Sequence, residues 1–444
     1  MSRFWLTAFA LCGAPLAAQQ PIQYQQYALD NGLRVFLVED HDTPIVTVDI
    51  WYNVGSRNER PGRSGFAHLF EHMMFQGSAN APKGLHSQLI ERAGGNLNGS
   101  TTQDRTNYFE TLPSNRLNLA LWLEADRMRS LAITDSNFEN QRETVKEERR
   151  MRIDNQPYAK AFIDGLAMQY DSTACYPYSH TTIGSMDDLN AAHTPDVQAF
   201  FNLYYKPNNA TLVVVGDFDQ AATRSLIQQY FGDIPRGDDP PPVVCNQPFN
   251  QGAERQVIPD PLANLPAVLT AYLVPPHDNA DTPALSLLST ILGNGESSRL
   301  NRSLVRDRQL AIQAGTFNDS RRGPGQFVVL AIANQGASAD SIEAALHAEV
   351  ARIAADGVTQ EELDKAKNDF RTSDVFGRQT TMNVAEELQH YAHDHDHVSE
   401  INTDAAQYMA VTLADIQRVA RQYLIPQNSL TLIVVPAPQT EVQP

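Results

Sequence analysis

The chain has 444 residues, of which 42% are hydrophobic and 19% charged, and its formal net charge at pH 7 is -18. The length exceeds one ordinary domain and fits two units of roughly 200 residues each. The excess of acidic groups argues against nucleic acid as a partner, because phosphate binding needs a basic surface. It also argues against stable docking on an anionic membrane.

The amino terminus has the pattern of an export signal. Arg3 supplies a positive start, residues 4–13 form a short apolar run, and small residues precede Gln19. The apolar run is shorter than the roughly 20 residues that span a bilayer. We therefore predict a signal peptide over residues 1–18, cleaved near Ala18, and an exported chain that is periplasmic or extracellular.

Two of the three cysteines belong to the predicted mature chain. Cys12 would leave with the signal, whereas Cys175 and Cys245 remain. An oxidising compartment would allow them to pair, but the sequence leaves their distance, and so the disulfide, open.

The predicted elements repeat one plan in two halves. Alternating and continuous apolar runs predict strands, and apolar residues spaced three or four apart predict helices. In the first half the predicted strand regions are 26–39, 45–54, 94–112 and 210–217, and the first of them is broken by a turn at 30–32. The predicted helices of this half are 65–75, 116–131, 137–152 and 194–204. In the second half the predicted elements are strands over 267–273, 327–333 and 429–435, and helices over 282–292 and 341–354.

A proline-rich, charged segment at 238–242 divides the two halves, because such a composition resists packing into regular elements. We therefore predict an N-terminal domain over 19–235, a linker over 236–252 and a C-terminal domain over 253–444. Aligning Gly77 with Gly293 sets the apolar residues Ala284, Leu287 and Leu288 opposite His68, Glu71 and His72.

The chemistry of the first half centres on the sequence His68-Leu69-Phe70-Glu71-His72. A spacing of four residues places both imidazoles on one face of a helix, where they can hold one metal ion. Zinc catalysis needs three protein ligands and an open position for water, and a nearby carboxylate can take the proton of that water. Glu71 is placed for the role of general base.

The third metal ligand is left open by spacing. The predicted helix over 137–152 offers Glu143, Glu147 and Glu148. Histidines and glutamates also fall into this pattern by chance on solvated helices. The apolar residues on both sides of the motif favour a metal site, because buried imidazoles and carboxylates are costly unless they are paired or bound to metal.

Three segments resemble one peptidase family, the inverzincins of the pitrilysin and mitochondrial-processing-peptidase type. The first is Gly65-Phe66-Ala67-His68-Leu69-Phe70-Glu71-His72-Met73-Met74-Phe75-Gln76-Gly77. The second is Gly94-Gly95-Asn96-Leu97-Asn98-Gly99-Ser100-Thr101-Thr102 with Asp104, Thr106 and Tyr108. The third is Tyr205-Lys206-Pro207-Asn208-Asn209-Ala210.

The resemblance implies what spacing leaves open. It implies that Glu148 is the third ligand of one Zn²⁺ per chain. It implies an α+β fold of two similar halves, each an antiparallel-rich sheet with helices packed on one face. It also implies that an extended peptide adds to an edge strand, so that the candidate substrate-binding residues are Asn98, Gly99, Ser100 and Thr101.

The chain departs from the family pattern at two places. Gln141 stands where many members have a second glutamate that supports the metal site. An arginine and a tyrosine of the second half, which help to hold substrate, are replaced by Val305 and Ile312, and the adjacent Arg306 has no tyrosine near it. We therefore expect a heterodimer in which a homologous metal-free subunit supplies the Arg/Tyr pair; a homodimer is the alternative.

These observations predict an exported zinc endopeptidase that cuts extended peptides or unfolded segments with Glu71 as general base. A non-catalytic assembly or peptide-binding subunit of the same fold is the alternative function. The four histidines between His390 and His397 lack the spacing of helical ligands, and we interpret them as part of a solvated loop after a helix. Tyr108 and Trp122 are expected in the core.

Overall fold

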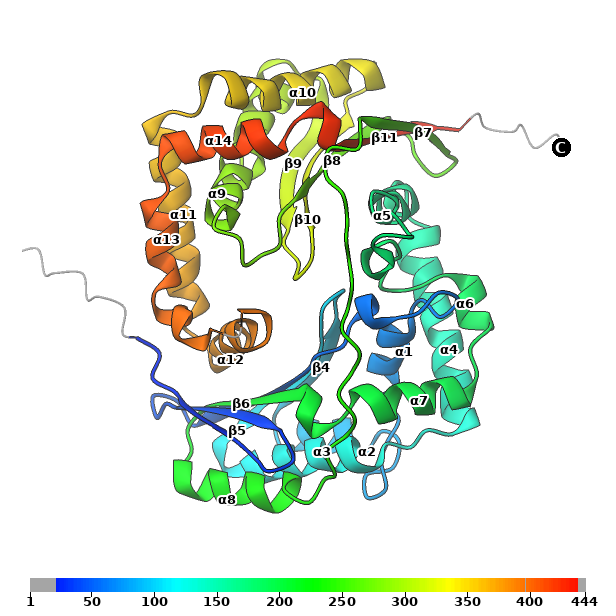
Figure 1. Ribbon diagram of the computed structural model, residues 1–444, viewed down its shortest axis with the longest axis vertical. Coiled ribbons are helices and arrows are strands. Elements are labelled where there is room, and N and C mark those ends of the chain that lie inside the picture. The colour runs from blue at the N-terminus through cyan, green and yellow to red at the C-terminus, as the bar shows by residue number, and fades with distance from the viewer. Residues whose placement is uncertain (1–20, 396, 438–444) are drawn as a thin grey trace, which may run out of the picture.

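The computed structural model describes residues 21–395 and 397–437, so the predicted signal peptide lies outside the described residues. The chain forms two halves, each built on a mixed sheet, which lie one above the other in Figure 1. Helices and strands together confirm the expected α+β class. Within the described residues, no helix has both the length and the apolar character needed to cross a bilayer.

The first sheet has six strands in the order β1-β2-β6-β3-β5-β4. Adjacent strands run antiparallel except β2 and β6, which are parallel. The strand β4 is therefore an outer strand. The bounds are β1 (Gln25–Ala28), β2 (Arg34–Glu39), β3 (Ile45–Tyr52), β4 (Asn96–Thr101), β5 (Thr106–Pro113) and β6 (Ala210–Gly216).

The helices of the first half form its main hydrophobic core against one face of this sheet. They are α1 (Phe66–Met73), α2 (Leu85–Arg92), α3 (Leu117–Ser130), α4 (Asp135–Arg149), α5 (Ala159–Met168), α6 (Met186–Asn190), α7 (Thr194–Tyr204) and α8 (Gln220–Phe231). The exception is α5, which packs on the other half.

The second sheet has the order β7-β11-β8-β10-β9, again with one parallel pair, β7 and β11. This order repeats that of the first sheet without β1, so β9 corresponds to β4. The strands are β7 (Glu254–Asp260), β8 (Ala267–Val274), β9 (Ala311–Asp319), β10 (Gly325–Ala333) and β11 (Ser429–Pro436). The helices are α9 (Thr282–Gly293), α10 (Ala339–Asp356), α11 (Gln360–Gly377), α12 (Thr381–His390), α13 (Asp404–Ala410) and α14 (Leu413–Tyr423).

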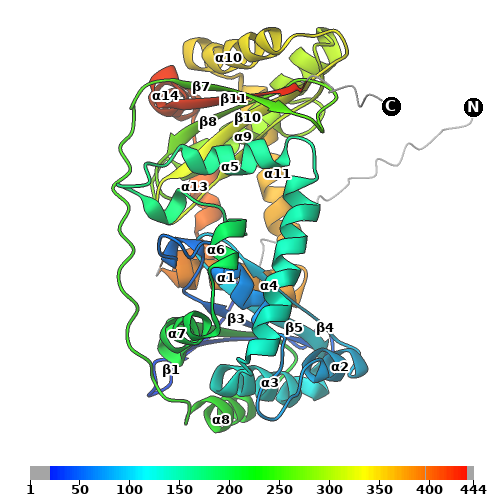
Figure 2. The same cartoon turned by 90° about the vertical axis from the view of Figure 1, so that its right-hand side faces the viewer.

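The connection between α8 and β7 contains no helix or strand and runs along one side of the molecule (Figure 2). Its residue Cys245 forms a disulfide with Cys175, which lies after α5. The sequence left open whether these two cysteines pair, and the structure shows that they do. The disulfide links the extended connection to the first half.

Each sheet receives a helix from the opposite half on its second face. On the first sheet, α12 packs Ala385 and Leu388 against β2 and β6, and Gln389 donates its amide to the carbonyls of Asp49 and Thr211, at 2.9 Å each. On the second sheet, α5 packs Phe162 and Leu166 against strands β8, β10 and β11. Each sheet thus has the expected layer of helices on one face and, in addition, a single helix from the opposite half on its other face.

The exchange of helices explains why β6 reads as a continuous apolar run. Leu212 and Val214 belong to the main core of the first half, whereas Val213 and Val215 pack with α12 on the opposite face. A strand covered on both faces has no solvent side, so its side chains do not alternate between apolar and polar.

The interpretation of the histidines near the end of α12 as a solvated loop is wrong for His393. The chain continues as a π-helix over Tyr391–His395, and His393 is only 8% exposed. Its ring contacts the indole of Trp51, and its Nε2 lies 3.4 Å from the carbonyl of Asp104. The error arose because α12 is held by the first sheet, a contact between distant segments that local spacing does not reveal.

The interlocked helices predict a stability effect. Leu388 is fully buried between α12 and the first sheet, so Leu388→Ala should lower the free energy of unfolding by about 3 kcal/mol. The exposed Asn383 of the same helix is a matched control, and Asn383→Ala should change it by less than about 0.5 kcal/mol. Denaturant unfolding measures both. Equal losses in the two variants would contradict packing of α12 on the first sheet.

Candidate active site

The helix α1 begins at a buried polar anchor. The Glu59 carboxylate accepts hydrogen bonds from the amides of Gly65 and Ala67, at 2.8 and 2.7 Å, and His180 Nε2 lies 3.1 Å from it. Gly65 has a φ of 87°, and a Cβ there would lie 2.6 Å from the carbonyl oxygen of Ile183. Glycine is therefore required at this position, and the start of α1 is fixed.

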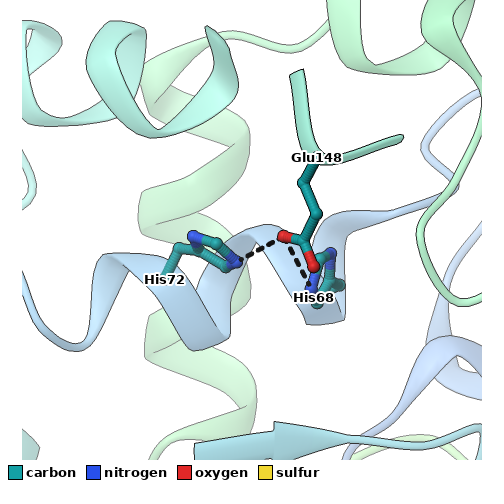
Figure 3. Close-up of side chains that lie close together, drawn as sticks. All are labelled: His68, His72 and Glu148. Carbon is teal, nitrogen blue, oxygen red and sulfur yellow. Dashed lines mark ion pairs between the residues drawn. The ribbon is translucent and has the colours of Figure 1, made fainter. Parts of the chain in front are cut away.

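The helix α4 brings one of its three candidate glutamates to the histidines of α1. Glu148 Oε2 lies 3.2 Å from Nε2 of His72 and 3.7 Å from Nε2 of His68 (Figure 3). The ligand atoms of the three residues all lie within 4.8 Å of one another. Glu143 is instead paired with Lys146, and Glu147 with Arg150.

His68 and Glu148 have the ionisation that a metal ligand requires. Burial, together with the neighbouring His72, lowers the pKa of His68 to about 4, so this imidazole is neutral near pH 7. The hydrogen bond with His72 and the proximity of His68 hold the pKa of Glu148 below its usual value. Two converging imidazole nitrogens and a carboxylate form a donor set that fits zinc, with the fourth position left for water.

Arg152, four residues after Glu148, is a further neighbour of the site. It lies 2.9 Å from Glu148 Oε1, while Oε2 faces the histidines. The spacing of four residues on a helix was the available signal. This pairing orients the carboxylate so that one oxygen remains directed at the imidazoles.

Glu71 lies on the same helix but faces β4. Thr101 Oγ1 donates a hydrogen bond to Glu71 Oε2 at 2.6 Å. Burial raises the pKa of Glu71. Its carboxylate is therefore held between the helix with the two histidines and the outer strand of the sheet.

The strand β4 has one edge without a partner strand in the described structure. Thr102 donates its amide to the carbonyl of Arg105 next to this pair of strands. Because hydrogen-bonded pairs alternate along antiparallel strands, Ser100 and Asn98 bond to β5 through their backbone. The backbone groups that face outward are those of Leu97, Gly99 and Thr101.

The side chains of the other candidate substrate-binding residues are engaged locally. Asn98 Oδ1 accepts a hydrogen bond from the outward-facing amide of Gly99 at 2.9 Å. Ser100 Oγ donates to Asn107 Oδ1 at 2.7 Å, and Arg105 donates to the carbonyl of Ser100 at 2.9 Å. The side-chain oxygen of Asn98 thus occupies the position at the Gly99 amide that a backbone carbonyl of an added strand would take.

The residues at the two departures form no hydrogen bond or ion pair with the three converging side chains within the part of the chain that the structure describes. Gln141 is buried in α4, but it donates to Asn140 Oδ1 at 2.8 Å and has no hydrogen bond to the histidines or Glu148 within the described residues. Val305 packs partly buried against the second core, whereas Ile312, on the outer strand β9, is 53% exposed. Arg306 is exposed.

A second group of possible ligands, which the sequence analysis missed, lies in the core behind the site. His86, Glu110 and Glu124 converge, but Arg127 pairs with Glu124 and lies 3.6 Å from Glu110. A guanidinium between the carboxylates already supplies the positive charge that a metal would bring, so this group is a buried ion cluster. Its residues are far apart in sequence and offered no local signal.

Comparison with known proteins places this arrangement in a family. The model described as "Insulinase (Peptidase family M16)" matches residues 34–170, and that described as "Peptidase M16 inactive domain" matches residues 194–370. The zinc protease PqqE of Helicobacter pylori is 32% identical over 430 residues, which cover 96% of each chain. This chain belongs to the M16, or insulinase-like, peptidase family.

Two solved structures support the fold. A protease from Helicobacter pylori matches with a TM-score of 0.90 and 31% identity, covering 94% of this chain and all of the other. The periplasmic protease PqqL from Escherichia coli matches with a TM-score of 0.77 and 19% identity, covering 94% of this chain but 48% of that chain. The fold of this chain therefore corresponds to about half of the longer protein.

The choice among the three glutamates of α4 can be tested by metal content. Glu148→Gln should lower zinc affinity by about 100-fold or more, since changes to residues that merely support a ligand already cost about 10–100-fold. Glu143→Gln and Glu147→Gln, on the same helix but paired elsewhere, should bind zinc like the native chain. Zinc measured after dialysis against buffers of graded free metal gives the three affinities. Unchanged binding by Glu148→Gln would contradict its place as a ligand.

Proposed function

We propose that the chain is a zinc-dependent endopeptidase that hydrolyses peptide bonds of extended peptides or unfolded segments. The observation that carries the proposal is the convergence of His68, His72 and Glu148, with Glu71 beside them at the outer strand. Other members of the family are named zinc proteases, which supports the same reading. The two histidines and Glu148 are the proposed ligands of one zinc ion per chain.

Zinc bound there would lower the pKa of a water molecule and polarise the scissile carbonyl. The role of Glu71 is to accept the proton of the attacking water and later to deliver a proton to the leaving amine. Its Oε2 accepts the Thr101 hydroxyl, and Oε1 accepts no hydrogen bond within the described residues, so Oε1 is the oxygen that is free to take the proton.

The proposed substrate lies along β4. The outward backbone groups of Leu97, Gly99 and Thr101 would pair with an extended peptide, and successive side chains of that peptide would face α1 and α12 in alternation. Main-chain pairing places few demands on sequence, which fits unfolded segments as substrates. Asn98 would release the Gly99 amide as the peptide binds.

A metal-free homologous subunit is the proposed partner. The positions of the family's substrate-holding arginine and tyrosine carry Val305 and Ile312, neither of which can donate a hydrogen bond through its side chain. PqqL offers a partial parallel, because its first half alone matches this chain and the matching part is about half of its full length. We propose that this chain obtains its second unit as a separate subunit. We also propose that this chain itself divides into the domains 19–235 and 253–444.

The alternative function, a non-catalytic subunit of the same fold, is less well supported. The model named for an inactive domain matches residues 194–370, which contain none of the three proposed ligands. The amino-terminal pattern, together with the likeness to the periplasmic protease PqqL, supports the proposal that the chain is exported to the periplasm.

Removal of the proposed base separates catalysis from metal binding. Glu71→Gln should keep about one zinc per chain and lower kcat by about 100-fold to 10,000-fold, the usual contribution of a general base. His72→Ala should lose both zinc and activity. Hydrolysis of an unfolded peptide and zinc content, measured on the same samples, test both variants. A Glu71→Gln variant with native kcat would contradict the proposed mechanism.

The partner is tested by mixing. The purified chain alone should hydrolyse unfolded peptides slowly, and a homologous chain that lacks the His-x-x-Glu-His motif but has the Arg/Tyr pair should raise the rate by about tenfold or more, as expected when a substrate-holding donor is restored. The matched control is the same partner with its arginine and tyrosine replaced by Val and Ile. Full activity of this chain alone, at the rate of the mixture, would contradict the heterodimer.

A further inference from the structure

The outer strand and the proposed base are in direct contact at two consecutive outward-facing positions. Thr101 donates its hydroxyl to Glu71 Oε2 at 2.6 Å. At Gly99, an added Cβ would lie 3.3 Å from Cγ of Glu71 and 3.1 Å from Cδ1 of Tyr108. Gly99 and Thr101 therefore lie against Glu71 on one face of β4, while their backbone groups lie at the edge proposed to bind the substrate.

The Thr101 contact determines which way the Glu71 carboxylate points. Within the described residues, it is the one hydrogen bond that the carboxylate accepts. A carboxylate on a helix can otherwise rotate about its terminal torsion, which has a broad energy profile. With Oε2 held by Thr101, this rotation is restricted and the position of the other oxygen is set as well.

We propose that Thr101 is a positioning residue, whose hydroxyl holds the Glu71 carboxylate in the orientation needed for proton transfer while its backbone lies at the edge where the peptide adds. The inference rests on the proposed function, and it extends that function by giving β4 a second task. The strand that aligns the peptide also aligns the base, so the two are placed relative to each other by one element. Gly99 leaves the space in which Glu71 lies.

Two replacements at Thr101 separate the hydroxyl from the shape of the side chain. Thr101→Val removes the donor and keeps the branched shape, whereas Thr101→Ser keeps the donor. We expect Thr101→Val to lower kcat by about tenfold to 100-fold, as for the loss of a hydrogen bond to a charged group, with KM changed less than about twofold. Thr101→Ser should recover kcat to within about threefold of native.

A matched control is available in the same sheet. Thr111 of β5 shares a hydrogen bond with Thr47 at 2.8 Å, so Thr111→Val also removes one hydroxyl from the sheet, but away from Glu71. It should leave kcat and KM within about twofold of native. Zinc content should be native in all three variants, because none of them alters a proposed ligand.

The outcomes distinguish the inference from the function on which it rests. Native kcat in Thr101→Val, an equal loss in Thr101→Ser, or a change confined to KM would overturn the positioning role while leaving the peptidase intact. A crystal structure of Thr101→Val gives a readout that does not depend on activity: we expect the Glu71 carboxylate to rotate or to adopt two orientations. A single native orientation would overturn the inference. By contrast, an inactive native enzyme with full zinc, or an active Glu71→Gln, would refute the proposed function itself.

Discussion

The position of α1 is the constraint on which the candidate site depends. One short helix carries both histidines and the proposed base, and it must face α4 with one part of its surface and β4 with another. The buried Glu59 carboxylate fixes its start by accepting two backbone amides that have no partner within the helix. A negative charge at this end is also favoured by the helix dipole, so the anchor stabilises α1 while it sets its direction.

The exchange of helices between the halves turns two similar units into one body. Separation of the halves would expose the apolar side of α12 and of α5 together with the sheet faces that they cover. It would also break the bonds from Gln389 to the first sheet and from Gln326 of β10 to the carbonyl of Leu166 in α5. The outer strands β4 and β9 are therefore held in a fixed relation, and the peptide proposed to add to β4 would bind to a preformed edge.

The sequence predicted the parts of the fold that are written in local patterns. The two-histidine helix, the continuous run of β6 and the order of the larger elements follow from periodicity, and the choice of Glu148 followed from the family resemblance. The burial of His393 and the packing of α5 and α12 did not follow, because they depend on contacts between residues hundreds of positions apart. The same holds for the contact of Thr101 with Glu71: Thr101 was expected to bind substrate, but its hydroxyl faces the base.

The buried ion cluster contacts the strand β4 through Tyr108. Burial raises the pKa of both Glu110 and Glu124 and lowers that of His86 to about 3, so the imidazole is neutral. The charge of Arg127 offsets the negative charge of the cluster, and such a cluster resists rearrangement because any unpaired charge would be costly in the core. The guanidinium of Arg127 lies 4.4 Å from the ring centre of Tyr108, and Tyr108 in turn lies against Gly99. The buried charges therefore pack, through Tyr108, against the same strand whose Thr101 holds Glu71.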